Sequence, residues 1–358
     1  MFIAITLFFI SVGCWSNLAL GSNPNEFLSE LNNQADSSYL EWTNPIRNGL
    51  NDYGNKDFHI LFIEGTYFLT ATEQNNPKEN KRGVVLYESD DMVNWTESAV
   101  LIDRNKVATD KWYLDEWRAP KIVPFKGKYF LTFNCRNNTL RPYSKTGLGI
   151  AVSDAINGHY TVLSPDKAIV EANNSYVFVD TDKKAYVYWD MDGRIFASEI
   201  DLEGAVLIGK TNEVFSPETM GNDFHFSDSP FVMKKDNEYM MLITQFSGGY
   251  VVRVRQLVAS KPFGPWEFND DGELLTFLES EADEVLKMPY EQGYTFAPPT
   301  QVIFHHSIFK GINDKYFMAW HTSEKYSEPY LWITPVTFLK NSVKLIDPKN
   351  TYQKVQVK

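Results

Sequence analysis

The sequence contains only two cysteines in 358 residues, Cys14 and Cys135. A disulfide framework is therefore excluded, and the fold must be stabilised by burial of a hydrophobic core. The chain also lacks any run of Lys and Arg, and its net charge is −12 at pH 7. Because nucleic-acid binding requires a positive surface facing the phosphates, we expect no nucleic-acid partner.

The apolar segment near the N-terminus, Phe2 to Val12, is too short to span a bilayer as a helix and is typical of a signal peptide. The small residues of Ala19-Leu20-Gly21 predict a cleavage site. No Lys or Arg precedes Arg47, so the usual basic start is missing. We predict a signal peptide over residues 1–21, no membrane span, and a secreted or periplasmic protein; a lipid anchor at Cys14 is the alternative.

Helical periodicity is also absent, and the chain instead repeats a β-hairpin pattern five times. Each copy has an alternating apolar strand, a polar turn and a second strand that opens on a tyrosine. These tyrosines follow one another at intervals of 62, 57, 53 and 77 residues: Tyr67, Tyr129, Tyr186, Tyr239 and Tyr316. Such hairpins recurring at roughly 50 residues indicate propeller blades. We predict an all-β, five-bladed β-propeller over residues 44–350, preceded by a lead-in at 22–43.

The residues that open the first strand of each repeat include several that can carry chemistry. They are Asp57, Ala119-Pro120, Asn174, Asp228 and His305. The first strand of a propeller blade lies innermost, so we expect these residues to meet at one end of the central channel. Two carboxylates facing one cavity suit glycoside hydrolysis, in which one activates a water and the other protonates the leaving oxygen.

Several motifs resemble those of glycoside hydrolase family 43. They are Asn44-Pro45 with Asp57 and Tyr67-Phe68, Leu86 to Trp95, Arg118-Ala119-Pro120, Val258-Ala259-Ser260 with Gly264-Pro265-Trp266, and His305-His306-Ser307. The resemblance implies a five-bladed propeller glycosidase acting on arabinose-, xylose- or galactose-type polysaccharides or oligosaccharides of plants or algae. It also implies a carbohydrate as the partner, and we expect a monomer.

Carried over to this chain, the family pattern makes Asp57 the general base and His305 the histidine at the channel axis, which helps to hold a calcium ion. No cofactor is required for the inverting chemistry that it implies. Two positions depart from the pattern. Asn174 replaces an aspartate that raises the pKa of the acid, and an amide cannot do this by charge repulsion. Asp228 replaces the glutamate that acts as general acid, and its reach is shorter by about 1.5 Å.

Substrate contacts are predicted close to the second and fourth repeats. The rings of Trp112, Trp117 and Phe224 could stack on sugars, and Arg118 could bind hydroxyl groups or an acidic sugar. His225 is an alternative proton donor or a further contact.

Two alternatives stay open because of Asn174 and Asp228. One is a carbohydrate-binding propeller without catalysis, and the other is a related glycosidase, such as an anhydro-galactosidase, that uses a different acid. Fructan hydrolases are discounted because the chain lacks both of their motifs, W-M-N-D-P-N and R-D-P.

Overall fold

In the computed structural model, the described residues are 39–73, 82–140, 145–216, 224–247, 251–277, 302–323, 329–339, 342–348 and 351–356. The predicted signal peptide lies outside these residues. In the part of the chain that is described, no helix is long and apolar enough to cross a membrane.

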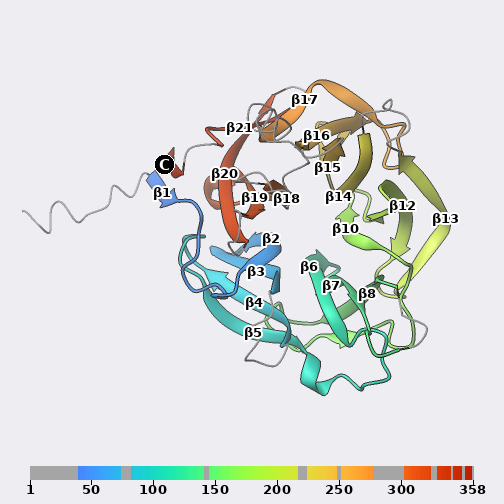
Figure 1. Ribbon diagram of the computed structural model, residues 1–358. Coiled ribbons are helices and arrows are strands. Elements are labelled where there is room, and N and C mark those ends of the chain that lie inside the picture. The colour runs from blue at the N-terminus through green and yellow to red at the C-terminus, as the bar shows by residue number, and fades with distance from the viewer. Residues whose placement is uncertain are drawn as a thin grey trace, which may run out of the picture.

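Five four-stranded antiparallel sheets surround a common centre, which confirms the predicted five-bladed β-propeller (Figure 1). Blade one consists of β2 (Asn55–Ile63), β3 (Thr66–Glu73), β4 (Gly83–Ser89) and β5 (Thr96–Asp103). Blade two consists of β6 (Asp115–Phe125), β7 (Lys128–Arg136), β8 (Gly147–Ser153) and β9 (Thr161–Val162). Blade three consists of β10 (Asn173–Val179), β11 (Ala185–Met191), β12 (Arg194–Asp201) and β13 (Val206–Phe215). Blade four consists of β14 (Phe224–Lys235), β15 (Glu238–Ser247), β16 (Val251–Ala259) and β17 (Glu267–Phe277). Blade five consists of β18 (Val302–Lys310), β19 (Tyr316–Ser323), β20 (Tyr330–Leu339) and β21 (Ser342–Leu345).

Among the described residues, two short helices and one pair of strands lie outside the blade sheets. Short 3-10 helices occur at Arg104–Lys106 and Ile312–Asp314. Strand β1 (Tyr39–Thr43) pairs with β22 (Tyr352–Gln356), so residues on either side of the predicted 44–350 span form a separate two-stranded sheet.

The burial of the strands follows from their place in the blade. The second strand β7 is buried along six consecutive residues, because neighbouring blades cover both of its faces. Its Leu131 and Phe133 side chains are fully buried. The outer strand β13 is largely exposed. Chains of this architecture therefore need apolar residues at successive positions of the second strand of each blade. This chain has them in β3, β7, β11, β15 and β19.

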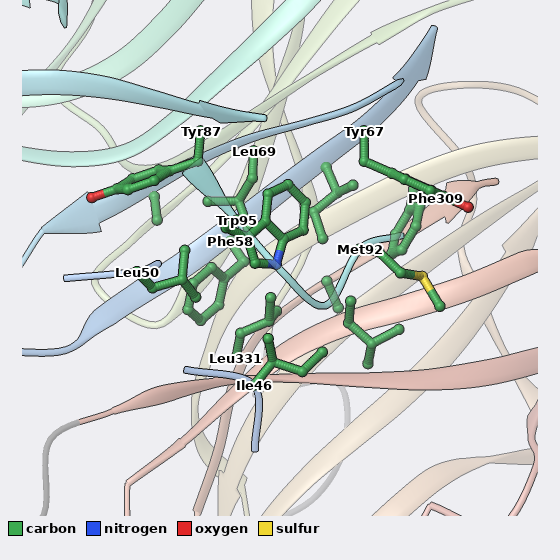
Figure 2. Packing of buried hydrophobic residues seen from close by; sticks show 14 of the residues in the cluster. Ile46, Leu50, Phe58, Tyr67, Leu69, Tyr87, Met92, Trp95, Phe309 and Leu331 are labelled. Atoms are coloured by element: carbon green, nitrogen blue, oxygen red, sulfur yellow. The ribbon is translucent and has the colours of Figure 1, made fainter. Parts of the chain in front are cut away.

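The ring closes where blade five meets blade one. Figure 2 shows the apolar cluster at this seam, in which Phe58, Leu69 and Trp95 lie near Phe309 and Leu331. The segment before blade one completes the closure through Asn44. Its side-chain Nδ2 donates to the backbone carbonyl of Ile333 at 2.9 Å, and the backbone N–H of Ile333 donates to Oδ1 of the Asn44 side chain at 3.0 Å.

The innermost strands β2, β6, β10, β14 and β18 share a β-bulge. One residue of each bulge has a left-handed backbone, and we call these five residues the bulge ring. The ring consists of Asp57 (φ 59°), Ala119 (φ 45°), Asn174 (φ 48°), Ser229 (φ 53°) and His305 (φ 40°). Such residues were predicted at strand starts, but each strand begins earlier and the bulge lies within it. In blade four the equivalent residue is Ser229, so Asp228 lies one position before the bulge ring.

Candidate active site

Asp57 is buried on β2, and its carboxylate is held by two donors. The Thr72 hydroxyl donates to Oδ2 at 2.5 Å, and His305 Nδ1 donates to Oδ1 at 2.9 Å. Burial would raise the pKa of Asp57, but the charge and hydrogen bond of His305 outweigh it and hold the pKa well below its ordinary value. Asp57 is therefore ionised at neutral pH, as a general base must be.

His305 on β18 connects Asp57 to blade three. Its Nε2 lies 2.7 Å from Oδ1 of Asn174. The carboxylate of Asp57 and the amide oxygen of Asn174 are both acceptors, so each ring nitrogen of His305 faces an acceptor. The axial position predicted for His305 is thus a bridge between Asp57 and Asn174.

Asn174 extends these hydrogen bonds to a carboxyl group that was not predicted from the sequence. Its Nδ2 donates to Oδ2 of Asp190 on β11 at 3.4 Å. Asp190 is 2% exposed, and burial together with the charge of Asp228 raises its pKa to about 7. The available signal was its place in the second strand of the repeat, four residues after Tyr186.

Asp228 is half-buried on β14, in the same region. Burial raises its pKa to about 6, the charge of Asp57 adds to this, and His305 and a hydrogen bond with Ser229 oppose it. Asp57 and Asp228 are thus close enough for the charge of Asp57 to affect the pKa of Asp228. The pKa of Asp57 is lowered, whereas that of Asp228 is raised. A pair of carboxyl groups whose pKa values are driven apart is the arrangement that acid–base hydrolysis requires.

A buried cation also lies at this end of the channel. The Lys121 ammonium donates to the carbonyl of Ser175 at 2.7 Å. Burial lowers its pKa to about 8, while Asp57 and Asp190 act in the other direction. Lys121 was not predicted as a site residue, because a lone Lys within an apolar strand carries no motif.

Asp57, His305 and His321 bring potential metal-binding atoms within 4.8 Å of one another. Calcium prefers six to eight oxygen ligands, whereas this group offers one carboxylate and two imidazoles. His305 directs both nitrogens at acceptors, and His321 Nδ1 accepts the backbone N–H of Asp57 at 3.2 Å. These side chains do not fit a calcium ion, so we assign no step to a metal; calcium near His305 stays an untested prediction.

The residues predicted to contact the substrate lie in different environments. Trp112 and Trp117 are each 7% exposed and pack on Phe133 in the core of blade two, which argues against stacking on a sugar. Arg118 is half-exposed but pairs with Glu116 at 2.6 Å. The side chains of Phe224 and His225 lie outside the described part of the structure.

Glu116, the partner of Arg118, is a further carboxyl group that could be considered as the proton donor. Although partial burial opposes the shift, hydrogen bonds from Arg136 and Asn138 and the charge of Arg118 lower its pKa. A carboxylate held in the ionised state is a poor proton donor, so Asp228 and Asp190 are better suited to that role.

The fold and this site define a class of protein, namely a propeller with an ionised carboxylate and carboxyl groups of raised pKa at one end of its channel, an arrangement suited to glycosidic hydrolysis. The family model of the glycosyl hydrolases family 43 matches residues 42–343. The chain belongs to this family and is therefore a glycosidase with a carbohydrate substrate.

Solved structures with the same fold include a thermostable family-43 glycoside hydrolase, with a TM-score of 0.67 and 20% identity over 88% of this chain and 99% of that one. An endo-arabinase from Bacteroides thetaiotaomicron VPI-5482 has a TM-score of 0.63 and 18% identity, covering 83% and 99% of the two chains. An endo-1,4-beta-xylanase from the same organism has a TM-score of 0.64 and 15% identity, covering 85% and 96%. No curated protein matches the sequence.

Proposed function

We propose that the protein is a secreted, inverting glycosidase that hydrolyses arabinose-, xylose- or galactose-type polysaccharides or oligosaccharides of plants or algae. Two carboxyl groups at one end of the channel carry this proposal: Asp57 is held by Thr72 and by His305, which keeps its pKa low, whereas burial raises the pKa of Asp228. The names of the similar structures, an arabinase and a xylanase, support the sugar class. Secretion is proposed from the predicted signal peptide.

In the proposed reaction, Asp57 removes a proton from a water as the water oxygen attacks the anomeric carbon. The bond between that carbon and the leaving oxygen breaks, and Asp228 gives its proton to the leaving oxygen. One water is consumed, and Asp57 gains a proton while Asp228 loses one. Attack from the face opposite the leaving group inverts the anomeric centre.

The first test is hydrolysis of arabinan, xylan, galactan and red-algal oligosaccharides, followed by the release of reducing ends. The Asp57→Asn variant should lose activity by about 100-fold or more, because the amide cannot accept the proton of the water. Asp52→Asn, an exposed position of the same segment, serves as the matched control and should keep its activity. Equal turnover by the Asp57→Asn variant and the wild type would sink the proposed role of Asp57.

The stereochemical outcome is a separate test. Proton NMR of the anomeric signals in the first minutes of hydrolysis should show a product of inverted configuration. Net retention would instead require a covalent intermediate on an enzyme carboxylate, and it would refute the assignment of Asp57 as a base.

A further inference from the structure

The residues that face the bulge ring from the second strands form a pattern of their own. Each pairs with the residue just before the bulge, and we call these five positions the opposing ring. The opposing ring consists of Thr72, Asn134, Asp190, Thr244 and His321. Asp190 is therefore one of five equivalent positions, and it is the only carboxylate among them.

Three other members of the opposing ring accept a backbone N–H from the inner strand of the next blade. Thr72 accepts from Ala119 at 2.7 Å, Asn134 accepts from Ser175 at 2.8 Å, and His321 accepts from Asp57 at 3.2 Å. The backbone N–H of Ser229 stands in the same relation to Asp190. The structural task of this position is thus to accept one N–H and so join adjacent blades.

An amide performs this task in blade two. Asn134 is buried, accepts the Ser175 N–H through Oδ1, and donates through Nδ2 to the carbonyl of Ala172 at 3.0 Å. A carboxylate is therefore not needed for the structural task, and its burial is unfavourable when ionised. What Asp190 has, and an asparagine at the same position would lack, is a proton that can be gained and lost.

The hydrogen bonds of Asp190 indicate that Asp228 is the group with which it can share this proton. Oδ2 of Asp190 is occupied by Asn174, whereas Oδ1 of Asp190 and Oδ1 of Asp228 are both buried with no hydrogen-bond partner among the described residues. A proton shared between the two carboxyl groups would satisfy both oxygens. The charged or titratable groups around this pair are Asp57 on β2, Lys121 on β6 and His305 on β18.

We propose that Asp190 is a positioning residue for Asp228: the two carboxyl groups share one proton, and Asp228, the more exposed of them, presents it to the substrate. This inference rests on the proposed role of Asp228 as the general acid. Asp190 would supply, from a neighbouring strand, the like charge that Asn174 cannot provide. The pair keeps its proton to a higher pH than Asp228 alone would, as expected for two carboxyl groups in one site.

The test compares pH profiles of kcat/KM for the wild type and the Asp190→Asn variant, on the best substrate of the panel above. The variant keeps an acceptor for Asn174 and Ser229, so its structure should be maintained. Its alkaline limb should move to lower pH by about one unit, which corresponds to an approximately tenfold lower kcat/KM on that limb. Asp192→Asn, an exposed position in the same hairpin, should leave the profile unchanged.

A second variant restores the charge from the other side of the hydrogen bond. In the double variant Asn174→Asp/Asp190→Asn, the amide and the carboxylate are exchanged, and the alkaline limb should return toward its wild-type position. Failure of the exchange to move the limb back in a folded protein, or an unshifted limb in Asp190→Asn, would overturn the inference while leaving the proposed hydrolysis intact.

Carboxyl carbon-13 NMR of aspartate-labelled protein gives a readout that does not depend on turnover. Two linked titration steps, both altered in Asp190→Asn and in Asp228→Asn, are expected for a shared proton. Two independent steps at ordinary pKa values would overturn the inference, even if Asp190→Asn fails to fold. If the wild type hydrolyses no glycan of the panel, the proposed function fails, but the titration still decides whether the proton is shared.

Discussion

Trp112 and Trp117 show how burial decides the role of an aromatic side chain. Both pack on Phe133, but only Trp112 uses its ring N–H, which donates to the carbonyl of Ser164 at 2.8 Å. Replacing either by Phe should lower the free energy of unfolding by about 2 kcal/mol through lost packing, and Trp112→Phe by about 1 kcal/mol more. Urea unfolding measures both values. KM should stay constant in both variants. A large rise in KM without a loss of stability would instead support the prediction that these rings stack on sugars.

The residues of the candidate site were predictable only in part. Asp57, Asn174, Asp228 and His305 were selected from the sequence because they recur at one position of a repeat, and the structure does gather them at one end of the channel. Asp190 was missed because its position is defined by strand pairing rather than by the start of a repeat. Its significance comes from contacts with β10 and β14, which no local pattern contains.

At the scale of the element, the shared bulge positions the chemistry. A bulge inserts one extra residue, so the side chains beyond it shift relative to the period-two pattern. Asp228 was therefore predicted among the residues that open the strands, whereas Ser229 is the left-handed residue of blade four. Hairpins could be predicted from alternation and turn residues, but the bulge could not, because it requires no particular residue type.

The bulge also gives a prediction at Ala119, which is buried with a φ of 45°. Ala119→Val should lower the free energy of unfolding by about 3 kcal/mol, because a β-branched side chain in the left-handed region adds strain to overpacking. Ala119→Gly should stay within about 1 kcal/mol of the wild type, since relief of strain offsets the added chain entropy. Ala151→Val, a buried alanine of β8 with ordinary backbone angles, measures overpacking alone in thermal unfolding. An equal loss in both valine variants would contradict a strained bulge.

At the scale of the whole molecule, the number of blades could be predicted because each blade repeats one hairpin with its tyrosine. The closure of the ring could not, because it joins segments that lie almost 290 residues apart. Asn44 was noted only as part of a motif beside Pro45. Its role depends on the folded ring, in which the last blade lies beside the first and the Asn44 side chain binds both the N–H and the C=O of Ile333.

Closure through Asn44 is therefore a testable property of the whole ring. Asn44→Ala removes both hydrogen bonds to Ile333 and leaves a buried backbone N–H without this acceptor, so the free energy of unfolding should fall by about 2–4 kcal/mol. Asn48→Ala removes a single exposed hydrogen bond to Asn94 in the same segment, and its effect should stay below about 1 kcal/mol. Urea unfolding of both variants should give the same dependence on denaturant, since the surface exposed on unfolding is unchanged. If Asn44→Ala were no more destabilising than Asn48→Ala, the seam between blades five and one would be held by its other contacts, such as the apolar cluster of Figure 2, and not by Asn44.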